Sequence, residues 1–258
     1  MEKNFNFLLT YYIMIPNIMH QIWTQGYDKI PPELKNYYTT CAKINSDFQH
    51  IFWDEEKIRA FLKTYYKPQF IEFYDACTYK AQKADVARYA ILYIYGGIYL
   101  DMDTVCRKNL SPFLKYDFFV TGNIMSKILR RYLNGIIGAR PRHPLFLVIF
   151  KNMFDRKAHL DDVLYSTGPK LLYASIEEYK KITNKNDISI VDTKYLYPCA
   201  IHNDSNCPST CKDCYIAHTS YVSWSPGLRC AKHIFKNLEL VLAILTIIII
   251  LIIICRRN

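Results

Sequence analysis

The stretch from Lys83 to Asp103, KADVARYAILYIYGGIYLDMD, constrains the fold of this chain more than any other feature. Apolar residues recur at helical spacing as far as Tyr95, which predicts a helix over residues 83–95. Gly96 and Gly97 can end that helix as a C-terminal glycine cap, and residues 98–100 form a short β-rich run. Helices that alternate with buried strands are typical of layered α/β domains, in which ligands bind at the carboxyl ends of strands. Asp101 lies at such an end.

The same alternation extends along most of the chain. An N-terminal segment, residues 1–14, precedes it, and Asp54 is a suitable N-cap for one of the helices. The predicted strands are residues 15–23, 48–53, 118–121, 135–139 and 188–191. The predicted helices are residues 31–38, 55–65, 83–95, 144–153 and 169–179. We therefore expect one α/β domain over residues 15–230, with a Rossmann-like, mixed and mostly parallel sheet.

The C-terminal region contains a long apolar run, residues 238–255, which reads LELVLAILTIIIILIIIC. Glu239 and Thr246 are its polar members. A helix of this length spans about 27 Å, close to the thickness of a thin bilayer. A buried strand is the alternative, but strands usually end by about eight residues. The run predicts a single transmembrane helix, followed by a short tail, residues 256–258.

Asp101 and Asp103 flank Met102 directly after the predicted strand. In an extended chain, residues two apart project to the same side, so both carboxylates can face one cation. Such oxygen ligands suit Mg²⁺ or Mn²⁺ shared with substrate phosphates. Taken alone, Asp-x-Asp is weak, because aspartates are common in turns. Asp85 and Arg88 share a helix face just before it, although a surface ion pair explains their spacing equally well.

This region closely resembles the DXD sugar-binding region of glycosyltransferases such as the fungal initiating α-mannosyltransferases and the catalytic subunits of mannosyl-inositol-phosphoceramide synthase. Large clostridial glucosylating toxins share that core. The resemblance runs from Ile15 to Trp224, and residues 15–23 (IPNIMHQIW) match the first strand of the family. Further matches are Asn134 with Ala139, Arg140, Pro141 and His143-Pro144; Thr167-Gly168-Pro169; and Ala217-His218 with Ser223-Trp224.

The resemblance implies a GT-A-type domain and a role for each matching residue. Trp23 would stack on the nucleotide base, with a core tryptophan as the simpler alternative. Asp101 would bind the ribose and reach the metal through water, and Asp103 would ligate the metal directly. Asp85 and Arg88 would contact the donor sugar. The implied catalytic residues are Asp85, Arg88, Asp101 and Asp103; further nucleotide-sugar contacts come from Tyr99, Asn134, Ser223 and Trp224; and His218 joins the metal ligands.

The implied activity is metal-dependent transfer of a hexose, with mannose favoured, and with retention of anomeric configuration. The donor would be GDP-mannose or a UDP-hexose, the acceptor a lipid or a glycan, and the cofactor Mn²⁺ or Mg²⁺. The resemblance also implies front-face departure of the nucleoside diphosphate. A regulatory membrane subunit is a further partner that it leaves open. The protein would be a single-pass protein of an endomembrane such as the endoplasmic reticulum or Golgi.

Five of the nine cysteines crowd the segment before the apolar run: Cys199, Cys207, Cys211, Cys214 and Cys230. Residues 199–214 form an insertion that the family pattern does not require. In an oxidising lumen we expect disulfides here, and in the cytosol free thiols or a zinc knuckle. Relatives often face the lumen, whereas the first 14 residues lack a recognisable cleavage site, which favours a cytosolic domain. The sequence leaves the side open.

Two other functions remain as alternatives. Residues 101–105 (DMDTV) also fit the nucleophile motif of haloacid-dehalogenase-type phosphohydrolases, but those enzymes need a downstream Gly-Asp pair that the chain lacks. A non-catalytic membrane scaffold would have no reason to keep Asp85, Arg88, Asp101 and Asp103 together. The net charge of +10 suits anionic partners such as diphosphates or lipid headgroups, and a solvated basic surface explains it as well. No nucleic-acid-binding pattern accompanies it, so nucleic acid is not a predicted partner.

Overall fold

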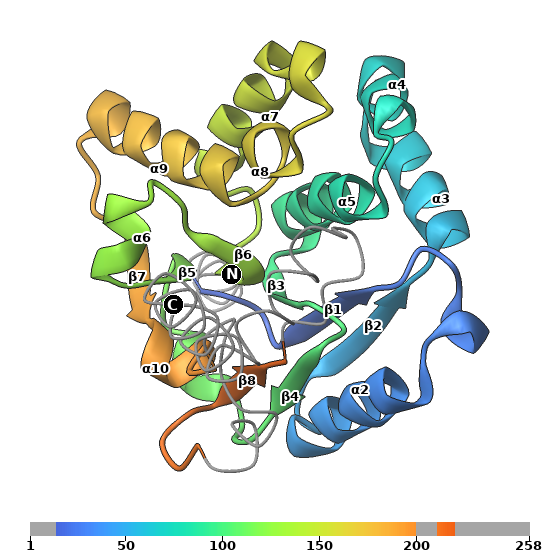
Figure 1. Ribbon diagram of the computed structural model, residues 1–258, viewed down its shortest axis with the longest axis vertical. Helices are drawn as coiled ribbons and strands as arrows, with labels where there is room; N and C mark the ends of the chain where they lie inside the picture. Colours follow the sequence, from blue (N-terminus) through green and yellow to red (C-terminus); the bar gives the residue numbers. More distant parts are fainter. Residues whose placement is uncertain (1–13, 200–210, 220–258) are drawn as a thin grey trace, which may run out of the picture.

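The computed structural model describes residues 14–199 and 211–219, and a six-stranded sheet runs through the middle of them (Figure 1). The strands of this sheet are β1 (Ile18–Ile22), β2 (Gln49–Trp53), β3 (Gly97–Leu100), β5 (Phe118–Gly122), β6 (Leu133–Ala139) and β7 (Ile188–Asp192). Their spatial order is β2-β1-β3-β6-β5-β7. Strand β1 is parallel to β2 and β3, and β5 is parallel to β7, whereas β6 is antiparallel to both of its neighbours. The predicted mixed, mostly parallel sheet is therefore confirmed.

Helices and a small ribbon cover the two faces of the sheet. The helices are α2 (Pro32–Ile44), α3 (Glu55–Tyr65), α4 (Pro68–Ala76), α5 (Lys80–Tyr95), α6 (Ile124–Ile128), α7 (Leu145–Asp155), α8 (Val163–Ser166), α9 (Pro169–Thr183) and α10 (Thr193–Leu196), with 3₁₀ turns η1 (Tyr27–Lys29), η2 (Ser111–Phe113) and η3 (Lys157–His159). One core cluster joins one face to α3, α4, α5, α7 and α9. A second joins the other face to α2, α10 and the ribbon of β4 (Thr104–Cys106) and β8 (Ile216–His218).

The two-residue period of the strands assigns side chains to these layers. In β3, Ile98 and Leu100 enter the second cluster, while Tyr99 between them enters the first, on the side of α5. The same division separates Phe118 from Phe119 in β5. Because Asp101 is two residues beyond Tyr99, the strand directs its side chain toward α5 as well.

The Gly96-Gly97 turn positions β3 against its neighbours. Gly96 ends α5, with its N–H donating to the Leu92 carbonyl, and both glycines have positive φ, 65° and 96°. A Cβ on Gly97 would lie 2.5 Å from the Ile18 carbonyl oxygen, so only glycine allows this close approach of β3 to β1. The predicted glycine cap is confirmed.

Several predicted elements have the expected bounds, and others differ. Helix α3 matches its prediction, and the Asp54 carboxylate accepts the Lys57 N–H at 2.9 Å as the predicted N-cap. The sequence patterns did not predict helix α4, which begins at Pro68; proline is suited to the first turn of a helix. The β4–β8 ribbon was also missed, because three-residue strands carry too little pattern.

Disulfides link the second layer. Cys41 of α2 is bonded to Cys106 of β4, a pairing that the sequence did not predict, and Cys211 is bonded to Cys214. Cys77 is a buried free thiol.

Among the residues that the structure describes, no helix is long and apolar enough to cross a membrane. The predicted transmembrane helix, residues 238–255, lies outside them, as do residues 1–13, Ser223 and Trp224.

Candidate active site

The acidic pair lies at the carboxyl end of β3, in a turn. The Thr104 N–H donates to the Asp101 carbonyl at 3.2 Å, and the Thr104 hydroxyl donates to the same oxygen at 2.6 Å. Asp101 is also held from β6, because its N–H donates to the Gly135 carbonyl at 2.8 Å. The expected extended Asp-x-Asp is therefore wrong, but its consequence holds: Met102 packs away from the pair against Ile30 and Leu34.

The β4–β8 ribbon brings His218 to the pair. Thr104 is paired with His218 in the ribbon, and the Thr219 N–H donates to the Asp103 carbonyl at 2.9 Å. The His218 Nε2 atom lies 3.0 Å from Asp103 Oδ1 and 3.5 Å from Asp101 Oδ2. One ligand atom from each of these three residues lies within 4.8 Å of the others. The predicted metal ligands thus converge.

Helix α5 supplies an ion-pair network next to Asp101. Arg88 Nη2 lies 3.1 Å from Asp85 Oδ1 and 3.2 Å from Asp101 Oδ1, and Arg88 Nη1 donates to the Asn134 carbonyl at 2.5 Å. Asp85 and Arg88 are each only 4% exposed, so the surface-ion-pair alternative for these two residues is wrong. Buried charges that are paired in this way resist displacement, which positions Asp101.

The Asp85 carboxylate has two further donors from distant parts of the chain. Asn134 Nδ2 donates to Oδ1 at 2.9 Å, and the Thr167 hydroxyl donates to Oδ2 at 2.9 Å. Tyr89 bridges these two residues, because its hydroxyl donates to the Thr167 carbonyl at 3.0 Å and lies 3.2 Å from Asn134 Nδ2. The side chain of Asn134 therefore supports Asp85.

Tyr99 lies behind Asp101. Its hydroxyl donates to Asp101 Oδ1 at 2.7 Å, its ring carries the Arg88 guanidinium 4.3 Å above the centroid, and the residue is buried. Tyr197 has a similar relation to His218, with the two rings stacked at 4.3 Å and 20°. Both aromatic residues orient a charged or titratable group.

Burial and charge shift the pKa values of these groups. Burial raises the pKa of Asp85 to about 6, against the opposing effects of the Arg88 charge and the hydrogen bonds from Thr167 and Asn134. Burial also raises the pKa of Asp101, but the positive Arg88, together with His218 and Tyr99, outweighs it and holds that pKa below its usual value. Asp101 is therefore ionised at neutral pH.

The donor set fits a divalent cation. Burial lowers the pKa of His218, but the charges of Asp103 and Asp101 and the hydrogen bonds to them outweigh burial and raise it to about 9. The two carboxylates thus attract positive charge to the place where His218 Nε2 lies. Two carboxylate oxygens and one imidazole nitrogen suit Mn²⁺, which accepts both kinds of ligand. Asp101, Asp103 and His218 are the residues that would hold it.

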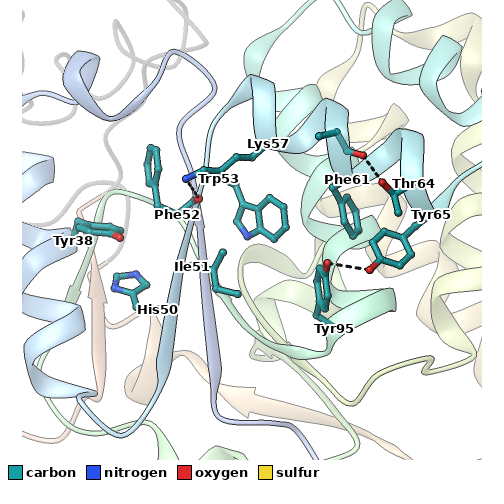
Figure 2. A pocket seen from close by; sticks show the side chains of 11 residues that line it. Tyr38, His50, Ile51, Phe52, Trp53, Lys57, Phe61, Thr64, Tyr65 and Tyr95 are labelled. Carbon is teal, nitrogen blue, oxygen red and sulfur yellow. Dashed lines mark hydrogen bonds between the residues drawn. The ribbon is translucent and has the colours of Figure 1, made fainter.

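Trp23 lies next to the pair and not in the hollow that runs along β2. It packs against Ile30, Leu34 and Met102, and its buried indole N–H has no hydrogen-bond partner among the residues that the structure describes. A hollow of about 670 Å³ follows β2 instead, between Tyr38 and His50 on one side and Trp53, Phe61 and Tyr95 on the other (Figure 2). None of its lining residues belongs to the predicted site, so we place the site on the chemistry of the acidic pair.

The structure thus brings together Asp85, Arg88, Tyr99, Asp101, Asp103, Asn134 and His218. Thr167 and Tyr197 were not assigned roles. Thr167 belongs to the Thr-Gly-Pro turn, which was a usable signal, whereas Tyr197 had none. Ser223 and Trp224, which the sequence also predicts here, lie outside the described residues.

Comparison with known proteins agrees with this geometry. Residues 31–120 match the family "glycosyltransferase sugar-binding region containing DXD motif", and this range includes Asp85, Arg88, Asp101 and Asp103. The chain is 55% identical over 231 residues to an uncharacterised glycosyltransferase of Acanthamoeba polyphaga mimivirus, covering 90% of this chain and 92% of that protein. The chain belongs to this glycosyltransferase family.

Fungal members of the family match a shorter part of this chain. Inositol phosphoceramide mannosyltransferase 3 of Schizosaccharomyces pombe is 36% identical over 172 residues, 65% of this chain and 46% of that protein. The Saccharomyces cerevisiae mannosyl phosphorylinositol ceramide synthase CSH1 is 30% identical over 196 residues, 74% of this chain. This chain spans about half the length of these fungal relatives.

Among solved structures, PaToxG glycosyltransferase has a TM-score of 0.53 at 19% identity, covering 70% of this chain and 79% of that one. The chain thus has a GT-A-like glycosyltransferase fold. Neither the family match nor this fold favours the phosphohydrolase or scaffold alternatives.

Proposed function

We propose that this glycosyltransferase transfers mannose from GDP-mannose to the polar head of a membrane lipid, with Mn²⁺ as cofactor and with retention of configuration. The observation that carries the proposal is the convergence of Asp101, Asp103 and His218 beside the buried Asp85–Arg88 pair. Mannose and a phosphoceramide-type acceptor follow from the names of the fungal relatives. A UDP-hexose donor and a glycan acceptor are the alternatives that a substrate screen would distinguish.

Each residue has a task in this proposal. Asp101, Asp103 and His218 hold the cation, which when bound offsets the negative charge of the departing nucleoside diphosphate. Arg88 pairs with Asp101 and keeps that carboxylate ionised and oriented. Asp85 pairs with the same guanidinium, and we expect Asp85 and Arg88 to bind donor hydroxyls. We also expect Trp23, which packs against Met102, to stack on the base.

The test uses the purified full chain in detergent. We expect release of GDP from GDP-mannose with Mn²⁺ and none with excess chelator. Asp103→Asn should lower turnover at least about 100-fold, because it removes one charged ligand, and should abolish the thermal stabilisation by Mn²⁺. Asp161→Asn, at an exposed aspartate, is the matched control and should keep both. Full turnover or full Mn²⁺ stabilisation in Asp103→Asn would refute the proposal.

A further inference from the structure

Helix α6 exposes an apolar surface that the transfer reaction does not explain. Ile124 is 74% exposed, Ile128 66%, Met125 49% and Leu129 44%. Ser126 points inward and is only 7% exposed. Exposed aliphatic side chains are ordinary when scattered, but four on one short segment form a contiguous patch, which marks an interaction site.

This segment is firmly held by hydrogen bonds. The Ser126 N–H donates to Asn123 Oδ1 at 3.2 Å and the Asn123 N–H donates to Ser126 Oγ at 3.1 Å, which together make a capping box. The Arg131 N–H closes the segment by donating to the Ser126 carbonyl at 2.9 Å. Asn123 Nδ2 also donates to Thr193 Oγ1 of α10 at 3.0 Å. The apolar side chains are thus presented outward by an ordered scaffold.

Basic side chains surround the apolar ones. Lys127 lies within α6, and Arg130 and Arg131 follow it directly; the first two are exposed and Arg131 is half-buried. We call these three residues and the four aliphatic residues the α6 patch. Aliphatic side chains flanked by lysine and arginine are the composition of segments that lie in the interface of an anionic bilayer. The net charge of +10 on the whole chain favours the same partner.

The α6 patch lies at the same end of the sheet as the site, where β3 and β5 finish. Helix α6 follows the carboxyl end of β5, and β5 runs in the same direction as β3, because both are antiparallel to β6. Strand β6 then returns from that end and supplies Asn134, which contacts Asp85 and Arg88. Figure 1 shows α6 beside β7 and far from α2 and α3.

We propose that the α6 patch inserts into the headgroup region of an anionic lipid bilayer. Insertion would turn the end of the sheet that carries the site toward the membrane surface. The importance of this orientation for a lipid acceptor rests on the proposed function, whereas the insertion itself does not. A protein partner fits less well, since a stable protein interface buries about 800 Å² per partner. Interfacial insertion needs only a few side chains buried by about 5–10 Å.

The test places a tryptophan in the α6 patch. The full chain carrying Ile128→Trp is reconstituted into phosphatidylcholine vesicles with brominated acyl chains, with and without phosphatidylserine. We expect bromine to quench the added tryptophan emission, about twofold or more strongly with phosphatidylserine, and high salt to reduce this difference. Ile182→Trp is the matched control. Ile182 is 67% exposed but lies near the end of α9, which leads into the start of β7 and so to the opposite end of the strands from α6. Equal quenching of the two variants, or none, would overturn the proposal.

A second arm separates membrane docking from catalysis. Ile124→Ser with Ile128→Ser should leave donor hydrolysis unchanged and lower transfer to a vesicle-embedded acceptor severalfold. If the wild type hydrolyses no sugar nucleotide, the proposed function fails while the quenching result still decides the docking. If the added tryptophan is not quenched and light scattering shows a dimer that the double variant lacks, the α6 patch contacts a second copy and the membrane proposal is wrong.

Discussion

At the scale of single residues, the position of Asp101 depends on Gly135 of the neighbouring strand. A Cβ at this position would lie 2.5 Å from Asp101 Oδ2 and 2.8 Å from the Tyr197 hydroxyl. Tyr197 in turn stacks on His218. One methyl group here would therefore press directly on Asp101 and, through the tyrosine, on His218, two of the three proposed metal ligands.

We predict that Gly135→Ala lowers kcat/KM at least about tenfold, because reacting groups lose activity when displaced by fractions of an ångström. It should also weaken the thermal stabilisation by Mn²⁺, while the cost in stability stays at about 1–3 kcal/mol. Steady-state kinetics and calorimetry check both. Gly122→Ala is the control, since its Cβ would meet the Tyr132 ring at 2.8 Å, away from the acidic pair. If both variants lose stability equally and neither loses activity, the assigned importance of Gly135 is wrong.

Residues of the candidate site could be predicted from the sequence where they belong to a recognisable local pattern. Asp101 and Asp103 follow a recognisable strand, and Asp85 and Arg88 share a helix face. The orientation of Tyr99 toward Asp101 follows from the strand period, but its burial behind the carboxylate depends on packing against α5. Gly135 contributes only through long-range contacts that one sequence does not contain. Thr167 belongs to a recognisable Thr-Gly-Pro turn, but its contact with Asp85 is also long-range.

At the scale of elements, His20 joins three of them. Its Nε2 hydrogen-bonds the Gly96 carbonyl at the end of α5 at 2.9 Å, and Trp53 Nε1 of β2 donates to its Nδ1 at 3.1 Å. This arrangement requires the neutral imidazole with its proton on Nε2. Burial accordingly lowers the pKa of His20 to about 4, against an ordinary value of 6.5.

This shift predicts acid sensitivity of the fold. In the unfolded chain this histidine becomes protonated near pH 6.5, whereas in the folded protein it stays neutral down to about pH 4. The stability that is present above pH 6.5 is therefore lost as the pH falls from 6.5 to about 4. The slope is at most about 1.4 kcal/mol per pH unit for each such histidine. Urea unfolding of wild type and His20→Gln at pH 7, 6 and 5 measures it. We expect a shallower dependence in the variant, in which His50 and His143, whose pKa values burial also lowers to about 4, still act in the same direction. Parallel curves would contradict this assignment.

The Cys41–Cys106 bond joins α2 to the ribbon that carries His218. It closes a loop with a sequence separation of 65, and both cysteines are buried. We predict that replacing both with serine lowers the free energy of unfolding by about 2–4 kcal/mol. Wild type under reducing conditions should lose a similar amount. Cys77→Ser, at a buried free thiol, should cost about 1 kcal/mol and respond to reductant as wild type does. Equal stability with and without reductant would mean that the bond does not form.

Long elements with a clear hydrophobic period were predicted within a few residues, as for α3, α5 and β5. The β4–β8 ribbon could not be predicted, because each strand has three residues and their pairing spans more than a hundred positions of chain. The predicted proximity of His218 to the acidic pair thus came from family resemblance, and the ribbon now gives its physical cause.

At the scale of the whole molecule, residues 238–255 predict that the protein partitions into membranes rather than into the aqueous phase. We expect the full chain to sediment with membranes and to resist extraction by alkaline carbonate, because the length of the apolar run predicts a transmembrane helix. A chain ending at residue 230 should appear in the carbonate supernatant. Carbonate extraction of the full chain would show that the run does not span the bilayer.

The ribbon also sets the order in which this enzyme becomes competent during its own synthesis. Both carboxylates of the acidic pair leave the ribosome with the first half of the domain, and His218, the third proposed ligand, arrives with the last strand of the described residues. Domains fold largely as units while the chain elongates at about 5–20 residues per second. Nascent chains therefore spend several seconds without the third proposed ligand, and we expect a chain that ends before residue 218 to lack transfer activity however well its sheet has formed.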